Sequence, residues 1–149
     1  MKRIVESRKL LGVTPEVTLA ELKNIYRGLI KEYHPDKIQD DDDRKHEYEA
    51  KSKQIITAYH LLVSVAPETH AAQEEEYNRI ITAAFIDDFQ YTGQTLKVSF
   101  QDGSVYEYFG VPRNIYIKFV NSPTQARFAR RHIYQSYTYR NISKQLQPA

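Results

Sequence analysis

The clearest periodic pattern in the chain is an apolar stripe within residues 18–33. Its positions recur at intervals of three and four residues, the spacing of one face of an α-helix. They are Leu22, Ile25, Tyr26, Leu29, Ile30 and Tyr33. Thr18 and Glu21 have the spacing of a capping box at the start of this helix. Because Pro35 disfavours helical geometry in the residue before it, the helix is predicted to end at His34.

Two further helical patterns flank this helix. Residues 44–64 carry apolar side chains at helical spacing. Residues 4–11 form a shorter pattern closed by Gly12, since glycine suits a helix C-terminal cap. Two helices of similar length joined by a loop are typical of antiparallel packing. The first 64 residues are therefore predicted to form a small helical module.

A third long helix is predicted over residues 65–90. Its helically spaced apolar positions are Tyr77, Ile80, Ile81, Ala84 and Phe85. An apolar stripe of this kind must be covered. The sequence leaves open whether it packs on the helical module or on the part of the chain that follows.

From Tyr91 onward the hydrophobic period becomes alternating. Apolar residues alternate with polar ones over residues 96–100, and Asp102-Gly103 turns the chain into a second apolar run at residues 105–109. This pattern predicts a β-hairpin.

Beyond the hairpin, the pattern predicts a short helix at residues 113–121 and a strand at residues 134–142. A capping box over Ser122 to Gln125 is expected to open another helix between them. The order of elements indicates an α+β fold. Its predicted parts are a helical module at residues 1–65, a connecting helix at 66–90 and an α+β module at 91–149.

The composition is that of an ordinary globular protein, and it excludes every function that depends on cysteine. The chain has 149 residues, of which 41% are hydrophobic and 27% charged, and it has no cysteine. Disulfides, thiolate zinc sites, iron–sulfur clusters and thiol catalysis are therefore excluded, and a reducing compartment is favoured. Because no signal peptide or membrane-length apolar run is apparent, the expected location is the cytoplasm.

The formal net charge of +2 hides an asymmetry. Residues 1–99 carry 14 Lys and Arg against 17 Asp and Glu, a net charge of −3, whereas residues 100–149 carry 7 against 2, a net charge of +5. Within the acidic part, Lys23, Arg27 and Lys31 are spaced by four residues and form a basic ridge on the first long helix. This basic ridge is either a solvated face or a contact surface.

Candidate catalytic and metal-binding residues are few. The run Asp40–Asp43 lacks the spaced oxygen ligands and the turn glycine of a calcium loop, so no metal site is predicted there. His34 and Asp36 straddle a proline, and His132 lies among arginines, but none of them has a nucleophile or a phosphate-binding glycine loop beside it. The chain is therefore expected not to be an enzyme and to use no cofactor.

Several short motifs occur in a specific order near the N-terminus. They are Leu10-Leu11-Gly12-Val13, Ile25-Tyr26-Arg27, Tyr33-His34-Pro35-Asp36-Lys37 and Ala58-Tyr59. With these motifs, residues 4–65 resemble the J domain of the DnaJ family. The resemblance implies a co-chaperone that docks on a DnaK-type ATPase chaperone, of the heat-shock seventy class, and stimulates its ATP hydrolysis.

The same resemblance implies which residues contact the chaperone. In that family, the His-Pro-Asp loop and the basic face of the helix before it make the contact. The corresponding residues are His34, Pro35, Asp36, Lys23, Arg27, Lys31, Tyr26 and Lys37. The chain departs from the family at Gly28 and Glu32, which thin the basic face, and at Ser7 and Ser52, which stand where aromatic residues are common.

A second resemblance covers residues 88–145. The motifs that carry it are Gly103-Ser104-Val105-Tyr106-Glu107-Tyr108, Val111-Pro112, Tyr116, Ser122, Phe128, Ile133 and Tyr137. This region resembles the KTSC domain, which is named for the C-terminus of some lysyl-tRNA synthetases. RNA binding is a role suggested for that family.

The same region interleaves cations with tyrosines, a combination that single-stranded RNA recognition uses. The candidate nucleic-acid-binding residues are Tyr106, Tyr108, Arg113, Arg127, Arg130, Arg131, Tyr137 and Arg140. A protein-interaction surface and a purely structural role are the competing interpretations, because tyrosines at strand period also build cores. The resulting prediction is a co-chaperone with a KTSC-like target-binding module. The alternative is an RNA-binding adaptor whose J module is vestigial or secondary.

Overall fold

The structure, a computed structural model, describes residues 1–34, 36 and 43–143. The chain divides into two compact units, one over Lys2–Thr69 and the other from His70 onward. The division falls inside the helix α4 (Pro67–Ala83). Helices alone build the first unit, and the second combines helices with an antiparallel sheet, so the predicted α+β class is confirmed. The domain limits at residues 65 and 90 stay predictions.

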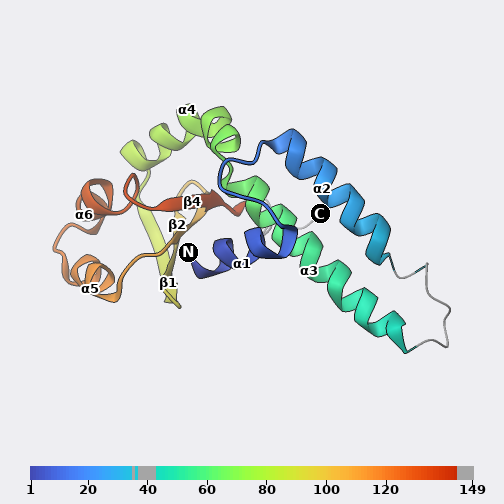
Figure 1. Cartoon of the computed structure of the whole chain (residues 1–149). Coiled ribbons are helices and arrows are strands. Elements are labelled where there is room, and N and C mark those ends of the chain that lie inside the picture. Colours follow the sequence, from blue (N-terminus) through green and yellow to red (C-terminus); the bar gives the residue numbers. More distant parts are fainter. Residues whose placement is uncertain (35, 37–42, 144–149) are drawn as a thin grey trace. The chain divides into compact units, whose positions relative to one another are not determined.

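The first unit is a helical module with a core shared by three helices. They are α1 (Lys2–Leu11), α2 (Leu19–Tyr33) and α3 (Arg44–Val65). Figure 1 shows α2 and α3 side by side, with the chain running out along one and back along the other. The buried apolar side chains are Ile4 and Leu11 from α1, Leu22 from α2, and Ile55, Ala58, Leu61, Leu62 and Val65 from α3. Of the apolar stripe predicted for α2, Leu22 is buried and the other five positions are half-buried.

Local capping fixes the ends of α1 and α2. The Thr18 N–H donates to Glu21 Oε1 and the Glu21 N–H donates to Thr18 Oγ1, both at 3.1 Å, so the predicted capping box is confirmed. At the end of α1, Gly12 has φ +70°. The N–H groups of Gly12 and Val13 return to the carbonyls of Lys9 and Arg8, which is a Schellman motif.

The second unit contains a four-stranded antiparallel sheet in the order β1-β2-β3-β4. Its strands are β1 (Ile86–Thr92), β2 (Thr95–Phe100), β3 (Val105–Phe109) and β4 (Thr138–Asn141). The helices α5 (Arg113–Asn121) and α6 (Gln125–His132) lie between β3 and β4 in the chain. The predicted hairpin is β2–β3, with Leu96 opposite Tyr108 and Val98 opposite Tyr106. Gly103 supplies the turn with φ +91°.

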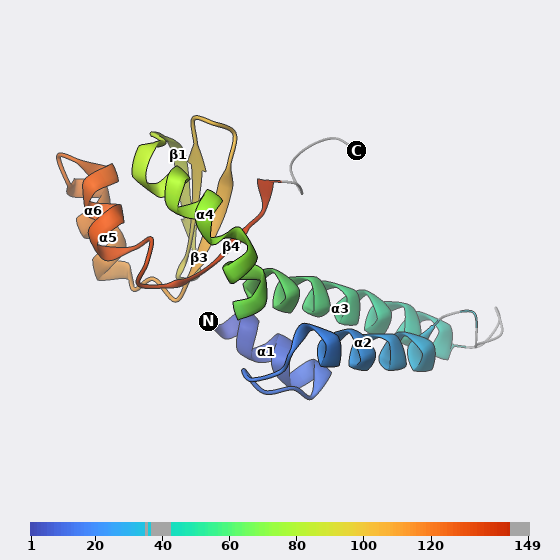
Figure 2. The same ribbon diagram turned by 90° about the horizontal axis from the view of Figure 1, so that it is seen from above.

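Helix α4 packs on this sheet, which settles where its apolar stripe lies (Figure 2). Tyr77, Ile80 and Ile81 join one hydrophobic core with residues from β2, β3, α5 and α6. The Tyr77 hydroxyl donates to the carbonyl oxygen of Tyr134 at 2.6 Å and lies 3.0 Å from the Tyr108 hydroxyl. Helix α4 is therefore a structural part of the second unit.

A histidine at the first turns of α4 is held against β4. His70 Nε2 lies 2.6 Å from the carbonyl oxygen of Tyr139, and the two rings are stacked with centroids 4.1 Å apart. Desolvation by burial lowers the pKa of His70, although its hydrogen bond to the Tyr139 backbone acts in the opposite direction.

Three sequence predictions for this unit were wrong in part. The helix predicted to residue 90 ends at Ala83, and residues 86–92 form β1. A register shift between Ile86 and Asp88 places two exposed polar residues in succession, which disrupts the alternation by which a strand is recognised. The strand predicted over residues 134–142 is confined to Thr138–Asn141, because the chain from residue 133 to 136 forms turns.

The capping box predicted at Ser122 is also absent from α6. The cap residue is Thr124, and it makes no side-chain capping hydrogen bond. The Gln125 amide donates to the carbonyl of Val120, and the Ser122 N–H donates to the carbonyl of Phe119. The Gln125 side chain therefore bonds the end of α5 instead of closing a capping box with Ser122.

Candidate functional site

The basic ridge lies on the exposed side of α2. Lys23, Arg27 and Lys31 are all exposed, and none of them forms an ion pair within the described part of the chain. Their spacing of four residues keeps them on one side of the helix. Three unneutralised cations in a row on a rigid helix can attract a negatively charged protein surface.

His34 and Asp36 follow directly after α2. The Asp36 N–H donates to His34 Nδ1 at 3.2 Å, and the Asp36 carboxylate lies 3.6 Å from the same nitrogen. An Nδ1 that accepts this bond leaves the ring proton on Nε2, which is then a free donor. The two side chains are 51% and 88% exposed, so both are accessible to a partner. Pro35 and Lys37, predicted with them, lie outside the described residues.

Aromatic contacts support the helix that carries these residues. The ring of Tyr26 stacks on the ring of Tyr59 from α3, with centroids 3.9 Å apart. Tyr33 meets Tyr48 edge to face at 5.4 Å. Tyr26 is half-buried by its stack, so its place in the structure is that of a support between α2 and α3.

Sequence reasoning noted Ser52 only as a departure from a family pattern, and the structure gives it a contact of its own. Its side chain is buried, and its hydroxyl donates to the carbonyl oxygen of Tyr33 at 3.0 Å. That carbonyl is in the last turn of α2, where main-chain acceptors lack partners within the helix. The hydroxyl therefore ties α3 to the residue that precedes His34. The polar residue type at a core position of α3 was the available signal.

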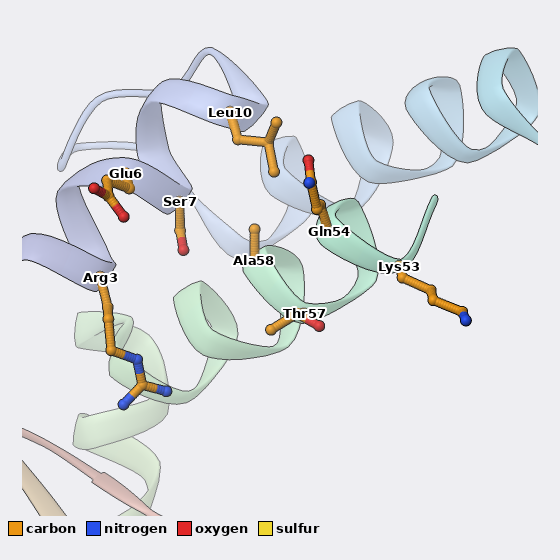
Figure 3. A pocket seen from close by; sticks show the side chains of 8 residues that line it. All are labelled: Arg3, Glu6, Ser7, Leu10, Lys53, Gln54, Thr57 and Ala58. Atoms are coloured by element: carbon orange, nitrogen blue, oxygen red, sulfur yellow. The ribbon is translucent and has the colours of Figure 1, made fainter. Parts of the chain in front are cut away.

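A groove lies on another side of the same unit, between α1 and α3 (Figure 3). It has a volume of about 520 Å³. The residues that line it are Arg3, Glu6, Ser7, Leu10, Lys53, Gln54, Thr57 and Ala58. The small side chains of Ser7 and Ala58 face each other across it, so the groove exists where a pair of larger side chains would fill the space.

In the second unit, several candidate nucleic-acid-binding residues are buried. Tyr106 and Tyr108 are 1% and 0% exposed. Burial raises the pKa of Tyr106 to about 12 and that of Tyr108 well above its usual value. Arg140 is buried as well, and its guanidinium bonds the Glu107 carboxylate at 2.6 and 2.7 Å. Rings and cations placed in this way are core components and cannot stack on a base or reach a phosphate.

The remaining candidates are more accessible. Tyr137 is half-buried, and Arg113, Arg127, Arg130 and Arg131 are exposed. Arg113 begins α5, whereas the other three arginines are on α6.

The arginines of α6 divide into two groups. The Arg130 guanidinium donates to the carbonyls of Thr82 and Ala126 at 3.3 and 3.4 Å. Arg127 and Arg131 line a hollow of about 330 Å³ at the start and along one side of α6. The other residues of this hollow are Ser122, Thr124, Phe128 and His132. Of the candidate set, Arg127 and Arg131 thus lie together in this hollow.

Two other features are absent from the described residues. No three His, Asp or Glu side chains among them are grouped so that they could hold a metal ion. None of the described helices combines the length and the apolar character that a bilayer crossing requires.

Comparison with known proteins gives two family matches. The DnaJ domain model matches residues 9–71, and the KTSC domain model matches residues 84–137. No solved structure matches the chain.

Curated relatives match each part of the chain. The chaperone protein DnaJ of Mesomycoplasma hyopneumoniae is 35% identical over 103 residues, which are 68% of this chain and 26% of that protein. The chaperone protein DnaJ of Hydrogenobacter thermophilus is 37% identical over 73 residues, 49% of this chain and 17% of that protein. A lysine–tRNA ligase of Trichormus variabilis is 36% identical over 62 residues, 40% of this chain and 11% of the ligase.

The chain spans about a quarter or less of the length of these relatives. The two matches do not overlap, and each falls mainly within one of the two units. The protein therefore carries a DnaJ domain at residues 9–71 followed by a KTSC domain at residues 84–137.

Proposed function

We propose that this protein is a J-domain co-chaperone that binds a DnaK-type ATPase chaperone and stimulates its ATP hydrolysis, while its second unit binds a target. One observation carries the proposal: within a DnaJ domain, the exposed His34 and Asp36 directly follow a helix whose exposed side is the basic ridge, which forms no ion pair with another described residue. Long-range charge attraction and short-range hydrogen-bonding groups are thus adjacent on one element.

The two parts of this surface have different tasks. The basic ridge raises the rate of encounter with an acidic chaperone surface, and this contribution falls as salt rises. The His34 imidazole and the Asp36 carboxylate then make directional hydrogen bonds that select one docked orientation. Because the Ser52 hydroxyl fixes the carbonyl of Tyr33, the residues that follow start from a defined backbone position.

The direct test is stimulation of the ATPase of a purified DnaK-type chaperone. His34→Gln and Asp36→Asn should each abolish stimulation, since the first replaces the imidazole ring with an amide of different geometry and the second removes the negative charge of the acceptor. Both side chains are exposed, so the thermal unfolding midpoint should stay that of the parent protein. Undiminished stimulation by either variant would contradict the proposal.

A second test separates the basic ridge from overall charge. The double variant Lys23→Gln, Arg27→Gln removes two charges from the ridge, and Lys9→Gln, Arg79→Gln removes two exposed charges elsewhere. The ridge variant should need about fivefold more protein for half-maximal stimulation, and this difference should shrink in high salt. Equal behaviour of the two double variants would show that the ridge has no specific role.

A second candidate function is an RNA-binding adaptor in which the DnaJ domain is secondary. The observation that favours it is the match of lysine–tRNA ligases to the KTSC region. Under this alternative, loss of chaperone stimulation through His34→Gln would leave the protein's cellular targets unchanged. Co-purification of the same targets with parent and variant proteins measures this outcome.

A further inference from the structure

The hollow beside α6 has the features of a binding site. It is lined by residues from the α5–α6 connection and from α6 itself, and its volume of about 330 Å³ falls within the range of small-ligand pockets, about 300–1,000 Å³. Arg127 and Arg131 are four residues apart, so both guanidinium groups extend from the same side of the helix.

Several polar groups of the hollow have donors that no other described residue uses. Arg127 and Arg131 have no ion pair or hydrogen bond within the described residues, in contrast to Arg130 and Arg140. Thr124 occupies the cap position of α6, but its hydroxyl makes no capping bond. The Ser122 hydroxyl oxygen accepts from the Thr124 N–H at 3.3 Å, so its own proton remains available.

This set of donors selects an anion with several oxygens. A guanidinium presents a planar fork of N–H groups that matches phosphate, and hydroxyl donors can bind the remaining oxygens. No carboxylate lines the hollow. A phosphate group is therefore the chemical match.

The surroundings of the hollow indicate a ligand with repeated charges. Residues 113–132, which include α5 and α6, contain five Lys and Arg and no Asp or Glu. Phe128 also lines the hollow, with its ring 4.8 Å from that of His132, and aromatic faces of this kind can stack on an unpaired base. One phosphorylated side chain would use only the hollow, whereas a nucleic-acid strand would also use the cations around it.

We propose that the hollow formed by Ser122, Thr124, Arg127, Phe128, Arg131 and His132 binds a backbone phosphate of single-stranded nucleic acid. This inference rests on the proposed role of the second unit as the target-binding unit, and it names the chemistry of that target. It also shifts the contact away from the buried tyrosines of the hairpin and onto α6.

The test uses the full-length protein and fluorescently labelled single strands of RNA and DNA with the same mixed sequence. Fluorescence anisotropy should show binding that weakens as salt rises. The double variant Arg127→Gln, Arg131→Gln should bind at least about tenfold more weakly. Its slope of log affinity against log salt should be smaller by about 0.7 for each phosphate that the variant no longer neutralises. The relative affinities of the RNA and DNA strands identify which of them supplies the phosphate.

The charge-matched control is Lys9→Gln, Arg79→Gln, which removes two exposed cations outside the hollow. It should bind with nearly the parent affinity. Failure of both strands to bind, an equal loss in the two double variants, or binding of a phosphoserine peptide in preference to both strands would overturn the proposal. ATPase stimulation is measured in parallel: stimulation without nucleic-acid binding would refute the phosphate site alone, and binding without stimulation would refute the co-chaperone role alone.

Discussion

The strongest structural prediction concerns where the second unit begins. A fragment of residues 91–149 corresponds to the α+β module expected from sequence, whereas a fragment of residues 70–149 also keeps most of α4 and all of β1. We expect the longer fragment to fold by itself and the shorter one to remain unfolded. The reason is that the shorter fragment lacks Tyr77, Ile80 and Ile81, which belong to the core.

The magnitude follows from burial. These three side chains are 3%, 4% and 6% exposed, and burying a side chain of this size contributes about 1.5–3 kcal/mol. Together they contribute about 5–9 kcal/mol, and the Tyr77 hydrogen bond to the Tyr134 carbonyl adds about 1 kcal/mol. Domains are stable by only about 5–15 kcal/mol, so the loss is comparable to the whole free energy of unfolding.

Circular dichroism melting and proton–nitrogen correlation spectra of both fragments measure this difference. The longer fragment should unfold cooperatively and give dispersed amide signals, and the shorter one should show neither property. Full-length protein with Ile80→Ala is an intermediate case, expected to lose about 2–5 kcal/mol. Cooperative melting of residues 91–149 at the same midpoint as residues 70–149 would refute the assignment of α4 to this core.

Three further predictions concern single contacts. Ser52→Ala removes the hydroxyl bond to the Tyr33 carbonyl and should lower the free energy of unfolding of the first unit by about 1 kcal/mol in urea titrations, and it should also weaken ATPase stimulation. Arg140→Gln breaks the ion pair with Glu107 and should destabilise the second unit by about 2–3 kcal/mol in thermal melts. In the folded protein the pKa of His70 lies below 6.5, its value in the unfolded chain. Protonation of His70 therefore favours the unfolded state, and the free energy of unfolding should fall as the pH drops through 6.5. Urea titrations across pH should show a smaller fall in His70→Gln than in the parent protein.

Each of these predictions has an outcome that contradicts it. Parent-like stability of Ser52→Ala would mean that the Tyr33 carbonyl finds another donor at no cost. If Arg140→Gln weakened nucleic-acid binding while the unfolding midpoint stayed constant, Arg140 would be a ligand contact and not a structural residue. An identical pH dependence in His70→Gln and the parent would assign the titration to another group.

Sequence reasoning succeeded where the decisive contacts are local. The capping box of Thr18 with Glu21 and the cap at Gly12 involve residues within a few positions of each other, so their spacing predicts their geometry. The short motifs of the DnaJ domain were recognised for the same reason. The bond of Ser52 to the Tyr33 carbonyl was not foreseen, because it joins residues 19 positions apart.

The errors arose where tertiary structure decides. β1 is disrupted by its register shift at Ile86, and it exists because it pairs with β2. The candidate nucleic-acid-binding residues proved partly buried and partly exposed for a similar reason. Which tyrosines are buried depends on the packing of α4 on the sheet, and residue type alone does not reveal that packing. Arg127 and Arg131 were named among the eight candidates, and only the structure places the two of them in one hollow.

The two edge strands of the sheet determine how readily another polypeptide could extend it. β1 carries a register shift and the exposed carboxylates of Asp87 and Asp88, and β4 is only four residues long. Short, bulged and charged edges are poor templates for an incoming strand. An unfolded chain that meets these edges therefore finds little exposed strand to pair with, and the sheet is protected from being extended into an aggregate.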